Sequence, residues 1–304
     1  MLVLAPAKIN LHLRVGKPRA DGFHPLVSWM CTVALFDKLM IDRAPGRGVT
    51  LSCDMPDLPC DAGNLIVKAA AALADAWAKS EASAAVELPG LAIRLSKQIP
   101  LGAGLGGGSS DGATTLKALN HLWAIRWPKQ KLADLAACLG SDLPFFFDGP
   151  SAICRGRGEL VEPISPPQSH FALLLLPQIH LPTPAVYRRF DQMNLGTDLA
   201  AEQEPNWGQW TRLPARNLLG RLVNDLEPAA FAICPELAKL QVEAEELLGR
   251  PVRMSGSGSS LFSLFDMKSE AEDGVRLMTQ LLHRNAIAVE IAPILTDDLN
   301  NLAG

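Results

Sequence analysis

The sequence predicts a soluble globular enzyme of the mixed α and β class, organised as two domains. Its 304 residues are roughly twice the length of a typical domain. Hydrophobic residues make up 48% of the chain and charged residues 20%, which is ordinary for globular enzymes and excludes a disordered chain. Stretches with the two-residue period of strands are interspersed with stretches that have the longer period of helices.

Charge and hydropathy exclude two classes of partner. The 28 Lys and Arg residues are outnumbered by 32 Asp and Glu residues, and a net charge of −4 argues against a nucleic acid as the main partner. The longest strongly apolar run, residues 171–176, is far shorter than the roughly 18–20 residues that span a bilayer. Pro6, Lys8 and Asn10 interrupt the apolar start, so it lacks the pattern of a signal peptide. We therefore expect a cytoplasmic protein.

Neither the cysteines nor the histidines predict a metal centre. The six cysteines are scattered without a C-x-x-C pair, and the six histidines lie far apart in the chain. In a cytoplasmic protein we expect the cysteines to be reduced thiols.

The first half of the chain contains two expected strands and three expected helices. Residues 9–14 alternate apolar Ile9, Leu11 and Leu13 with polar side chains, which predicts a half-buried strand. The remaining elements expected here are an alanine-rich helix over 64–79, a strand over 93–99 that ends before Pro100, a helix over 109–123 with one apolar face, and a short helix over 131–139 before Gly140.

The second half is predicted from fewer signals. Residues 171–176 form a buried strand, and residues 252–265 alternate around a second glycine-rich patch, MSGSGSS. Residues 191–215 are polar and are expected to form a long loop with little regular structure. The proline- and serine-rich segment EPISPPQS, residues 162–169, predicts the boundary between domains spanning 1–162 and 163–304.

The strongest local signal is a run of six glycines between Gly102 and Gly112 that opens a helix. Glycine lets a ligand approach the backbone closely, and a helix start presents free N–H groups and the positive end of the helix dipole. Both features favour a phosphate-binding loop. Ser109 and Ser110 stand where a helix N-cap is expected and could reach phosphate or Mg²⁺. The alternative is a flexible turn whose serines merely cap the helix.

Three well-known phosphate loops do not fit this run. Gly102, Gly104 and Gly107 satisfy G-x-G-x-x-G, but no second strand ending in an acidic residue follows, as a dinucleotide-binding fold requires. No lysine follows the glycines, which excludes a Walker-type P-loop. The later motifs of protein kinases are also missing.

The run PLGAGLGGGSSD, residues 100–111, instead resembles the phosphate-binding loop of the GHMP kinases, a superfamily of small-molecule kinases. Further motifs match in the family's order and span nearly the whole chain: PAKINLHL, ADGFHPL, NLIVKAA, LGSDLPFFFDG, GRGE, LPTPAVY, NDLEP and MSGSGSSLF. The resemblance implies an α+β GHMP kinase fold, with an N-terminal half like the second domain of ribosomal protein S5 and a ferredoxin-like C-terminal half. Phe23 in place of a frequent tyrosine, Gly112 in place of alanine, and a longer 191–215 segment are departures.

The resemblance implies transfer of the γ-phosphoryl group of ATP, with Mg²⁺, to the 2-hydroxyl of a small-molecule acceptor. The resemblance further implies that the acceptor is a cytidine diphosphate-linked methylerythritol, an intermediate of non-mevalonate isoprenoid biosynthesis. Asp142 matches the catalytic aspartate, which we assign as general base, and Lys8 matches the lysine that orients it. Considered singly, Asp142 would be assigned to a turn before Leu143-Pro144 and Lys8 to a solvated strand; only the joint match favours catalysis.

The remaining site residues also follow from the resemblance. The nucleotide is assigned to Pro100, Gly102, Ala103, Gly104, Leu105, Gly106, Gly107, Gly108, Ser109 and Ser110, with Asn64 and Lys97 near the adenine. Mg²⁺ is expected on the ATP phosphates, with Ser110 as a candidate ligand. The acceptor substrate is assigned to Asn10, Phe23, His24, Thr183, Pro184 and Tyr187, of which Phe23, His24 and Tyr187 hold the cytosine.

Three alternatives remain open at this point. A dinucleotide-dependent oxidoreductase would need neither Lys8 nor Asp142. A pseudokinase on the same fold would bind ATP without turnover. A GHMP kinase with another acceptor would not need the cytosine residues. We expect a monomer or a homodimer that binds neither nucleic acid nor membrane.

Overall fold

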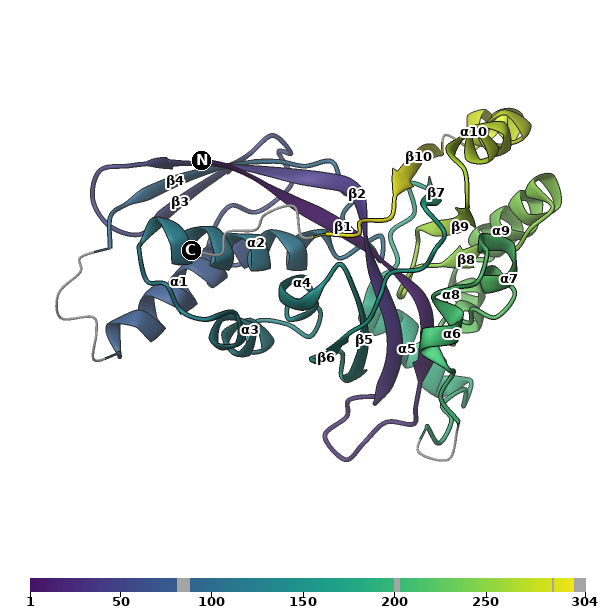
Figure 1. Cartoon of the computed structure of the whole chain (residues 1–304), viewed down its shortest axis with the longest axis horizontal. Helices are drawn as coiled ribbons and strands as arrows, with labels where there is room; N and C mark the ends of the chain where they lie inside the picture. The colour runs from purple at the N-terminus through teal and green to yellow at the C-terminus, as the bar shows by residue number, and fades with distance from the viewer. Residues whose placement is uncertain (81–87, 200–202, 286, 298–304) are drawn as a thin grey trace.

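The computed structural model describes residues 1–80, 88–199, 203–285 and 287–297. Its secondary structure alternates strands and helices, as the sequence predicts (Figure 1). The strands are β1 Leu2–Val15, β2 Leu26–Arg43, β3 Val49–Cys53, β4 Leu91–Ser96, β5 Ser151–Gly156, β6 Leu160–Pro163, β7 Phe171–Leu176, β8 Arg253–Met254, β9 Leu261–Phe265 and β10 Ala288–Pro293. The helices are α1 Leu65–Ala78, α2 Gly107–Leu122, α3 Lys129–Ala137, α4 Phe145–Asp148, α5 Thr183–Gln192, α6 Trp207–Trp210, α7 Ala215–Leu219, α8 Glu227–Ile233, α9 Pro235–Leu248, α10 Lys268–Leu277 and α11 Thr279–Arg284.

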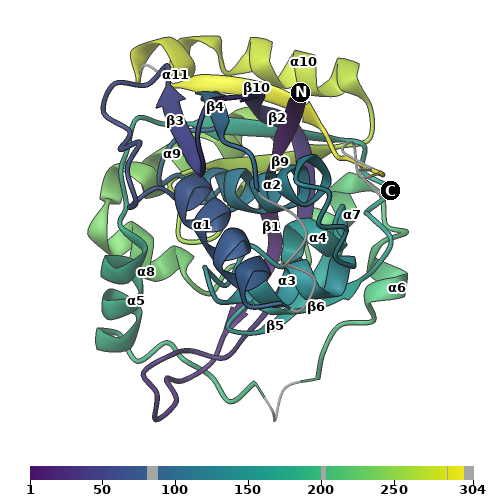
Figure 2. The ribbon, with the colours of Figure 1, turned by 90° about the vertical axis from the view of Figure 1, so that its left-hand side faces the viewer.

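The first sheet has six strands in the order β3-β4-β2-β5-β6, with β1 paired to β2. Only β3 and β4 run parallel; the other neighbours are antiparallel. Helices α1 to α4 lie together against one face of this sheet (Figures 1 and 2). Their apolar sides and the sheet form one buried cluster that includes Leu73, Leu119 and Phe145. This layer therefore provides a rigid support for the start of α2.

The second sheet has four antiparallel strands in the order β10-β7-β9-β8. Helices α5, α8, α9, α10 and α11 enclose a second apolar cluster with it, built around Phe190, Leu237 and Leu261. The chain passes from the first sheet to the second between Pro163 and Phe171, within the proline-rich segment. The domain limits at 162 and 163 stay a prediction.

A third apolar cluster lies between the two sheets. Ile9 and Leu11 of β1 and Trp29 of β2 pack there with Leu174 of β7 and Phe262 of β9. These five side chains are at most 1% exposed. The two halves therefore share a continuous core, and β1 and β2 contribute to both.

The prediction of a half-buried strand at residues 9–14 is wrong in one respect. Its polar face is buried as well: Lys8, Asn10 and His12 are only 3–4% exposed. The apolar face of β1 contacts the second sheet, and the polar face is enclosed because it lines an internal site. Burial and the charge of Arg14 lower the pKa of His12 to about 4.

The prediction that residues 191–215 contain little regular structure is confirmed for the described residues, with the short helix α6 as the main exception. Helix α5 continues to Gln192, α6 forms behind an Asn206 cap, and α7 begins at Ala215. Two tryptophans of α6, Trp207 and Trp210, stand edge-on to the His12 ring at 5.7 and 5.4 Å between centroids. The largely polar composition of residues 191–215 gave no indication of these contacts. Residues 200–202 of this segment lie outside the described ranges.

Within the described ranges, no helix combines the length and the apolar character needed to cross a membrane.

Substitution of Phe262 tests the shared core. Because its ring is fully buried between the sheets, Phe262→Ala is expected to lower the free energy of unfolding by about 3–5 kcal/mol. Urea denaturation followed by circular dichroism measures this change. The control is Leu277→Ala, since that side chain is 61% exposed and its loss should change stability by less than about 0.5 kcal/mol. A loss below about 1 kcal/mol for Phe262→Ala would contradict a core common to both halves.

Candidate active site

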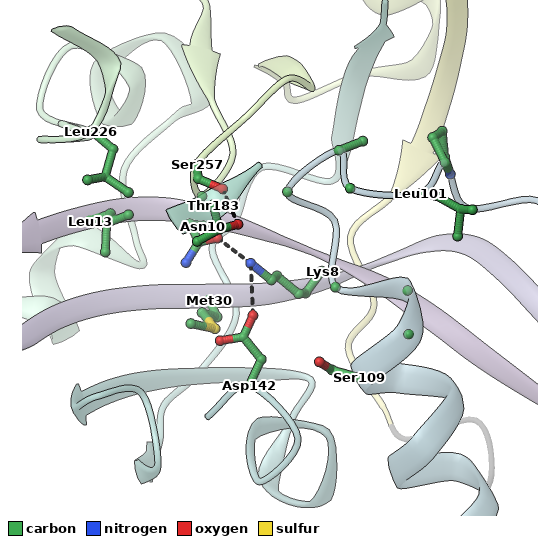
Figure 3. Close-up of a pocket in the computed structure, with 18 of the residues that line it drawn as sticks. Lys8, Asn10, Leu13, Met30, Leu101, Ser109, Asp142, Thr183, Leu226 and Ser257 are labelled. Carbon is green, nitrogen blue, oxygen red and sulfur yellow. Dashed lines mark hydrogen bonds and ion pairs between the residues drawn. The ribbon is translucent and has the colours of Figure 1, made fainter. Parts of the chain in front are cut away.

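A cavity of about 320 Å³ lies where β1, the glycine run, the start of α2 and the loop after β8 come together. Figure 3 shows the side chains that enter it from these elements. The cavity therefore draws on both halves of the chain.

Strand β1 delivers two polar side chains to the cavity. Lys8 and Asn10 are two residues apart, so the pleat directs both to the same side, opposite Ile9. The Lys8 ammonium donates a hydrogen bond to Asn10 Oδ1 and lies 3.4 Å from Asp142 Oδ2 (Figure 3). Asn10 in turn donates through Nδ2 to Ser28 Oγ at 2.8 Å. The lysine is therefore held in place by a chain of buried polar groups.

Asp142 approaches the lysine from the opposite wall, in the turn that precedes α4. Its side chain is 33% exposed, whereas that of Lys8 is 4% exposed. The ammonium is thus withdrawn from water while the carboxylate stays accessible from the cavity. Removal of water strengthens the attraction between the two charges. This arrangement can orient a carboxylate to accept a proton from a hydroxyl group in the cavity.

The glycine run forms a loop that leads directly into α2. Gly102, Gly104 and Gly106 all have positive φ, between 63° and 77°, which side-chain-bearing residues rarely adopt. Gly106 is the N-cap of α2, and the first intrahelical bond runs from Ser110 N to the Gly106 carbonyl. The expectation that Ser109 or Ser110 caps the helix is therefore wrong. The first-turn N–H groups have no intrahelical partner and suit an anionic ligand.

A second glycine-containing loop, residues 255–260, interlocks with the first. Ser255 donates through Oγ to the Gly104 carbonyl at 2.9 Å and accepts from the Asn10 N–H at 3.1 Å. The Ser260 N–H donates to the Ala103 carbonyl at 3.1 Å. A Cβ on Gly104 would overlap the carbonyl oxygen of Ser255. The close approach of the two backbones thus explains why glycine stands at position 104.

Ser255 and Ser257 are site residues that our sequence-based assignment missed. Ser257 Oγ lies 2.8 Å from Thr183 Oγ1, and both side chains line the cavity. The available signal was the motif MSGSGSSLF, whose glycines we noted without assigning a role to its serines. The sequence analysis also missed the apolar lining, which is formed by Leu13, Leu26, Met30, Leu65, Leu101 and Leu226.

Three charged side chains are buried beneath the glycine run. Lys97 forms ion pairs with Asp37 and, at 3.0 Å, with Asp111, and all three side chains are at most 4% exposed. Burial alone would lower the pKa of Lys97, but the charges of Asp111 and Asp37 raise it overall. Burial raises the pKa of Asp111 to about 7, and the charge of Lys97 only partly opposes this. Two carboxylates share one ammonium here, which favours retention of a proton on Asp111.

The structure brings most of the predicted residues to one cavity. Those that line it are Lys8, Asn10, Lys97, Pro100, Gly102, Ala103, Gly104, Gly106, Gly107, Gly108, Ser109, Asp142, Thr183 and Tyr187. Those that do not are Phe23, His24, Asn64, Leu105, Ser110 and Pro184.

Several of the second group have structural roles next to the cavity. Asn64 is the N-cap of α1 and accepts from the Ile66 N–H at 2.9 Å. Leu105 is buried, and its carbonyl accepts from the Lys8 N–H at 2.9 Å. Ser110 is fully buried behind the helix start, so the suggestion that it could bind Mg²⁺ is not supported. Ser109, one residue earlier, faces the cavity instead (Figure 3).

Two of the three residues assigned to cytosine, His24 and Tyr187, are in contact beside the cavity, and Phe23 precedes His24 in the chain. The His24 ring lies 5.1 Å from that of Tyr187, which lines the cavity. Phe23 is 49% exposed, and the Arg157 guanidinium stands 4.7 Å from the centre of its ring. Burial and the charge of Asp142 raise the pKa of Tyr187 to about 12, so its phenol is neutral.

The described side chains include no group of three His, Cys, Asp or Glu residues able to hold a metal ion. The oxygens that an ion on a bound polyphosphate could meet in the cavity are those of Ser109 and Asp142. Mg²⁺ is commonly bound through one or two protein oxygens together with phosphates and water. This donor set fits an ion that the nucleotide brings with it.

Comparison with known proteins identifies the family. The model of the GHMP kinases N terminal domain matches residues 64–150, and that of the GHMP kinases C terminal matches residues 203–282. A 4-diphosphocytidyl-2-C-methyl-D-erythritol kinase of Synechococcus sp. (strain CC9902) is 37% identical over 285 residues, 90% of each chain. The chain belongs to the 4-diphosphocytidyl-2-C-methyl-D-erythritol kinase family of GHMP kinases. The family predicted from the sequence is thus confirmed.

Other relatives support the same family and fold. The 4-diphosphocytidyl-2-C-methyl-D-erythritol kinase of Burkholderia thailandensis is 38% identical to this GHMP kinase, over 88% of this chain and 86% of that one. A crystal structure of 4-(cytidine 5'-diphospho)-2C-methyl-D-erythritol kinase has a TM-score of 0.74 and 32% identity, covering 96% of this chain and 99% of its own. A homoserine kinase from Cytophaga hutchinsonii, at 20% identity, has a TM-score of 0.69 and shares the fold.

Substitution of Gly104 tests the interlocked loops of this GHMP kinase. Gly104→Ala is expected to weaken ATP binding by at least about tenfold, because a Cβ would collide with the Ser255 backbone at a φ of +77°. Calorimetric titration with ATP measures the affinity. Gly220→Ala is the control, because its nearest non-neighbouring atom would be 3.8 Å from the new Cβ. Unchanged ATP affinity in Gly104→Ala would contradict the prediction that the contact between the glycine loop and the 255–260 loop shapes the ATP site.

The buried carboxylates predict a pH dependence of stability. Between about pH 4 and pH 7, the folded chain keeps a proton on Asp111 that the unfolded chain has lost. The contribution of Asp111 to stability therefore falls as pH rises through this window, by about 1 kcal/mol per pH unit. Asp111→Asn is expected to remove this slope, as measured by urea midpoints at pH 5, 6 and 7. Parallel pH profiles for wild type and Asp111→Asn would contradict the assignment.

Proposed function

We propose that this chain transfers the γ-phosphoryl group of ATP to the 2-hydroxyl of 4-diphosphocytidyl-2-C-methyl-D-erythritol. The products are ADP and the 2-phosphate, and the reaction belongs to the non-mevalonate synthesis of isoprenoid precursors. The observation that carries the proposal is the Lys8–Asp142 pair, which stands in one cavity with the open end of α2. The acceptor is inferred from the relatives' names and from the residues matched to cytosine.

The phosphates of ATP are assigned to the glycine loop. The N–H groups at the start of α2 and the positive end of its dipole favour the polyphosphate, and the glycines let it approach the backbone. Lys97 places an ammonium at the same wall, 3.2 Å from where a Cβ of Gly107 would lie. Mg²⁺, when bound to the phosphates, neutralises part of their charge; Ser109 is the side chain of α2 that could reach it.

The acceptor hydroxyl is assigned to the space beside Asp142. Its oxygen forms the new bond to the γ-phosphorus, the bond from phosphorus to the β,γ-bridging oxygen breaks, and Asp142 takes up the hydroxyl proton. The Lys8 ammonium, 3.4 Å from the carboxylate, orients Asp142 and stabilises negative charge on the attacking oxygen. In a loose transition state, positioning contributes more than early removal of the proton.

The cytidine end of the substrate is assigned to the aromatic group around Tyr187. Thr183 and Tyr187 lie on the same side of α5, one turn apart, and both line the cavity. The acceptor would extend from Asp142 along α5 toward His24 and Phe23. An extended substrate, with its acceptor hydroxyl at Asp142 and its base near Tyr187, would therefore meet these residues in this order.

The activity is tested by ADP release in the presence of Mg-ATP and 4-diphosphocytidyl-2-C-methyl-D-erythritol. Asp142→Asn keeps the shape of the side chain but cannot accept the proton, so kcat is expected to fall about 10²–10⁴-fold with little change in either KM. Asp148→Asn is the matched control, because Asp148 lies six residues later and pairs with Lys129 instead.

The other outcomes separate the alternatives. Full turnover in Asp142→Asn would remove this residue from its assigned role while keeping the kinase. ATP binding without turnover in the folded wild type would favour a pseudokinase or another acceptor. NAD-type binding without ATP binding would favour an oxidoreductase.

A further inference from the structure

Helix α5 carries a stripe of three functional positions along one side. Thr183, Tyr187 and Asp191 follow one another at intervals of four residues, which places them on the same face of a helix. The first two line the cavity, and the third lies in the last turn of the helix. Asp191 is part of neither the sequence-based assignment nor the cavity lining, so its place on this stripe needs an explanation.

Asp191 contacts the cavity residues through the His24 ring. Its Oδ1 lies 3.3 Å from His24 Nε2, and the other ring nitrogen, Nδ1, donates to the Gly16 carbonyl at 2.8 Å. The His24 ring packs against α5, with its centroid 5.1 Å from that of Tyr187 in a tilted arrangement and 5.7 Å from that of Phe190 in an edge contact. Both nitrogens are therefore engaged within the protein, and the side chain is only 6% exposed.

His24 is also the buried anchor of an otherwise exposed loop. Residues 17–23, which join β1 to β2, are all exposed, and His24 is the point at which this loop enters the core. The loop carries Phe23, while Tyr187 stands on α5 in the other half of the chain. The distance between these two aromatic residues thus depends on how firmly His24 is held against α5.

We propose that Asp191 is a positioning residue for the nucleobase end of the substrate site, acting through the His24 ring. The carboxylate pairs with Nε2 and so holds the β1–β2 loop against α5. This contact fixes the distance between Phe23 and Tyr187 at a value that suits a nucleobase. This inference rests on the proposed function, because it takes a cytidine group as the ligand of that region.

Binding of CDP provides a test that does not depend on turnover. Asp191→Ala removes the partner of Nε2, and we expect the Kd for CDP and the KM for the cytidyl substrate to rise together, by about tenfold. The KM for ATP and kcat at saturation should stay within about twofold of wild type, because Asp191 touches neither the glycine loop nor Lys8. A purely structural role would move all four quantities together or lower the melting temperature alone.

Two comparisons keep the result interpretable. Gln192→Ala, at the exposed neighbouring position, should leave CDP binding unchanged. In a His24→Ala background, Asp191→Ala should add no further loss, because residues acting through one contact are not additive. If His24→Ala does not fold, Asp191→Asn replaces it: the amide can still pair with Nε2, as acceptor through its oxygen or as donor through its nitrogen, and should restore CDP affinity to within about threefold of wild type.

Several outcomes would overturn the proposal. These are unchanged CDP affinity in Asp191→Ala, an equal loss of ATP and CDP binding, and additive effects with His24→Ala. Wild-type protein that binds ATP but not CDP would contradict the cytidine part of the proposed function itself, and with it the basis of this inference. The two failures are distinguishable because the second is seen before any variant is compared.

Discussion

The buried ammonium of Lys8 is the constraint on which the site depends. A charge in a strand that is enclosed on both faces is costly unless polar partners replace the lost water. Asn10 and Asp142 supply those partners, and Ser28 holds Asn10 in turn. Because these residues come from β1, β2 and the turn before α4, the pair exists only where these three elements are packed together.

The two halves of the chain meet in this site through backbone contacts that only small residues permit. The glycine loop of the first half and the 255–260 loop of the second exchange hydrogen bonds at Ala103, Gly104 and Ser255. The apolar cluster between the sheets includes Leu105 of the glycine loop and Phe262 of β9, so it packs the glycine loop against the second sheet. A displacement of the second sheet would therefore move the phosphate loop, and the shape of the nucleotide site depends on the packing of this shared core.

Charge is distributed unevenly around the proposed reaction centre. On one side the open end of α2 offers positive potential to phosphates. On the other, Asp142 offers the accessible negative charge. Beneath the loop, Asp37 and Asp111 would place two negative charges close to the nucleotide if both were ionised, and a proton retained on Asp111 keeps this buried group neutral overall.

Local patterns in the sequence were enough to predict a mixed α and β fold and a phosphate-binding loop, because the glycine run and the helix after it depend on backbone torsion and residue spacing, which are properties of short segments. Lys8 and Asp142 were assigned only because their motifs, taken together, resemble those of the GHMP kinases. Long-range packing decided the rest. It buries the polar face of β1 and packs Trp207 and Trp210 against His12. It also places the N-cap of α2 at Gly106 and directs Ser110 away from the cavity. It also joined Asp191 to His24 across 167 positions of sequence. No local pattern encodes such contacts, because their free energy depends on which surfaces the two halves of the chain bury against each other.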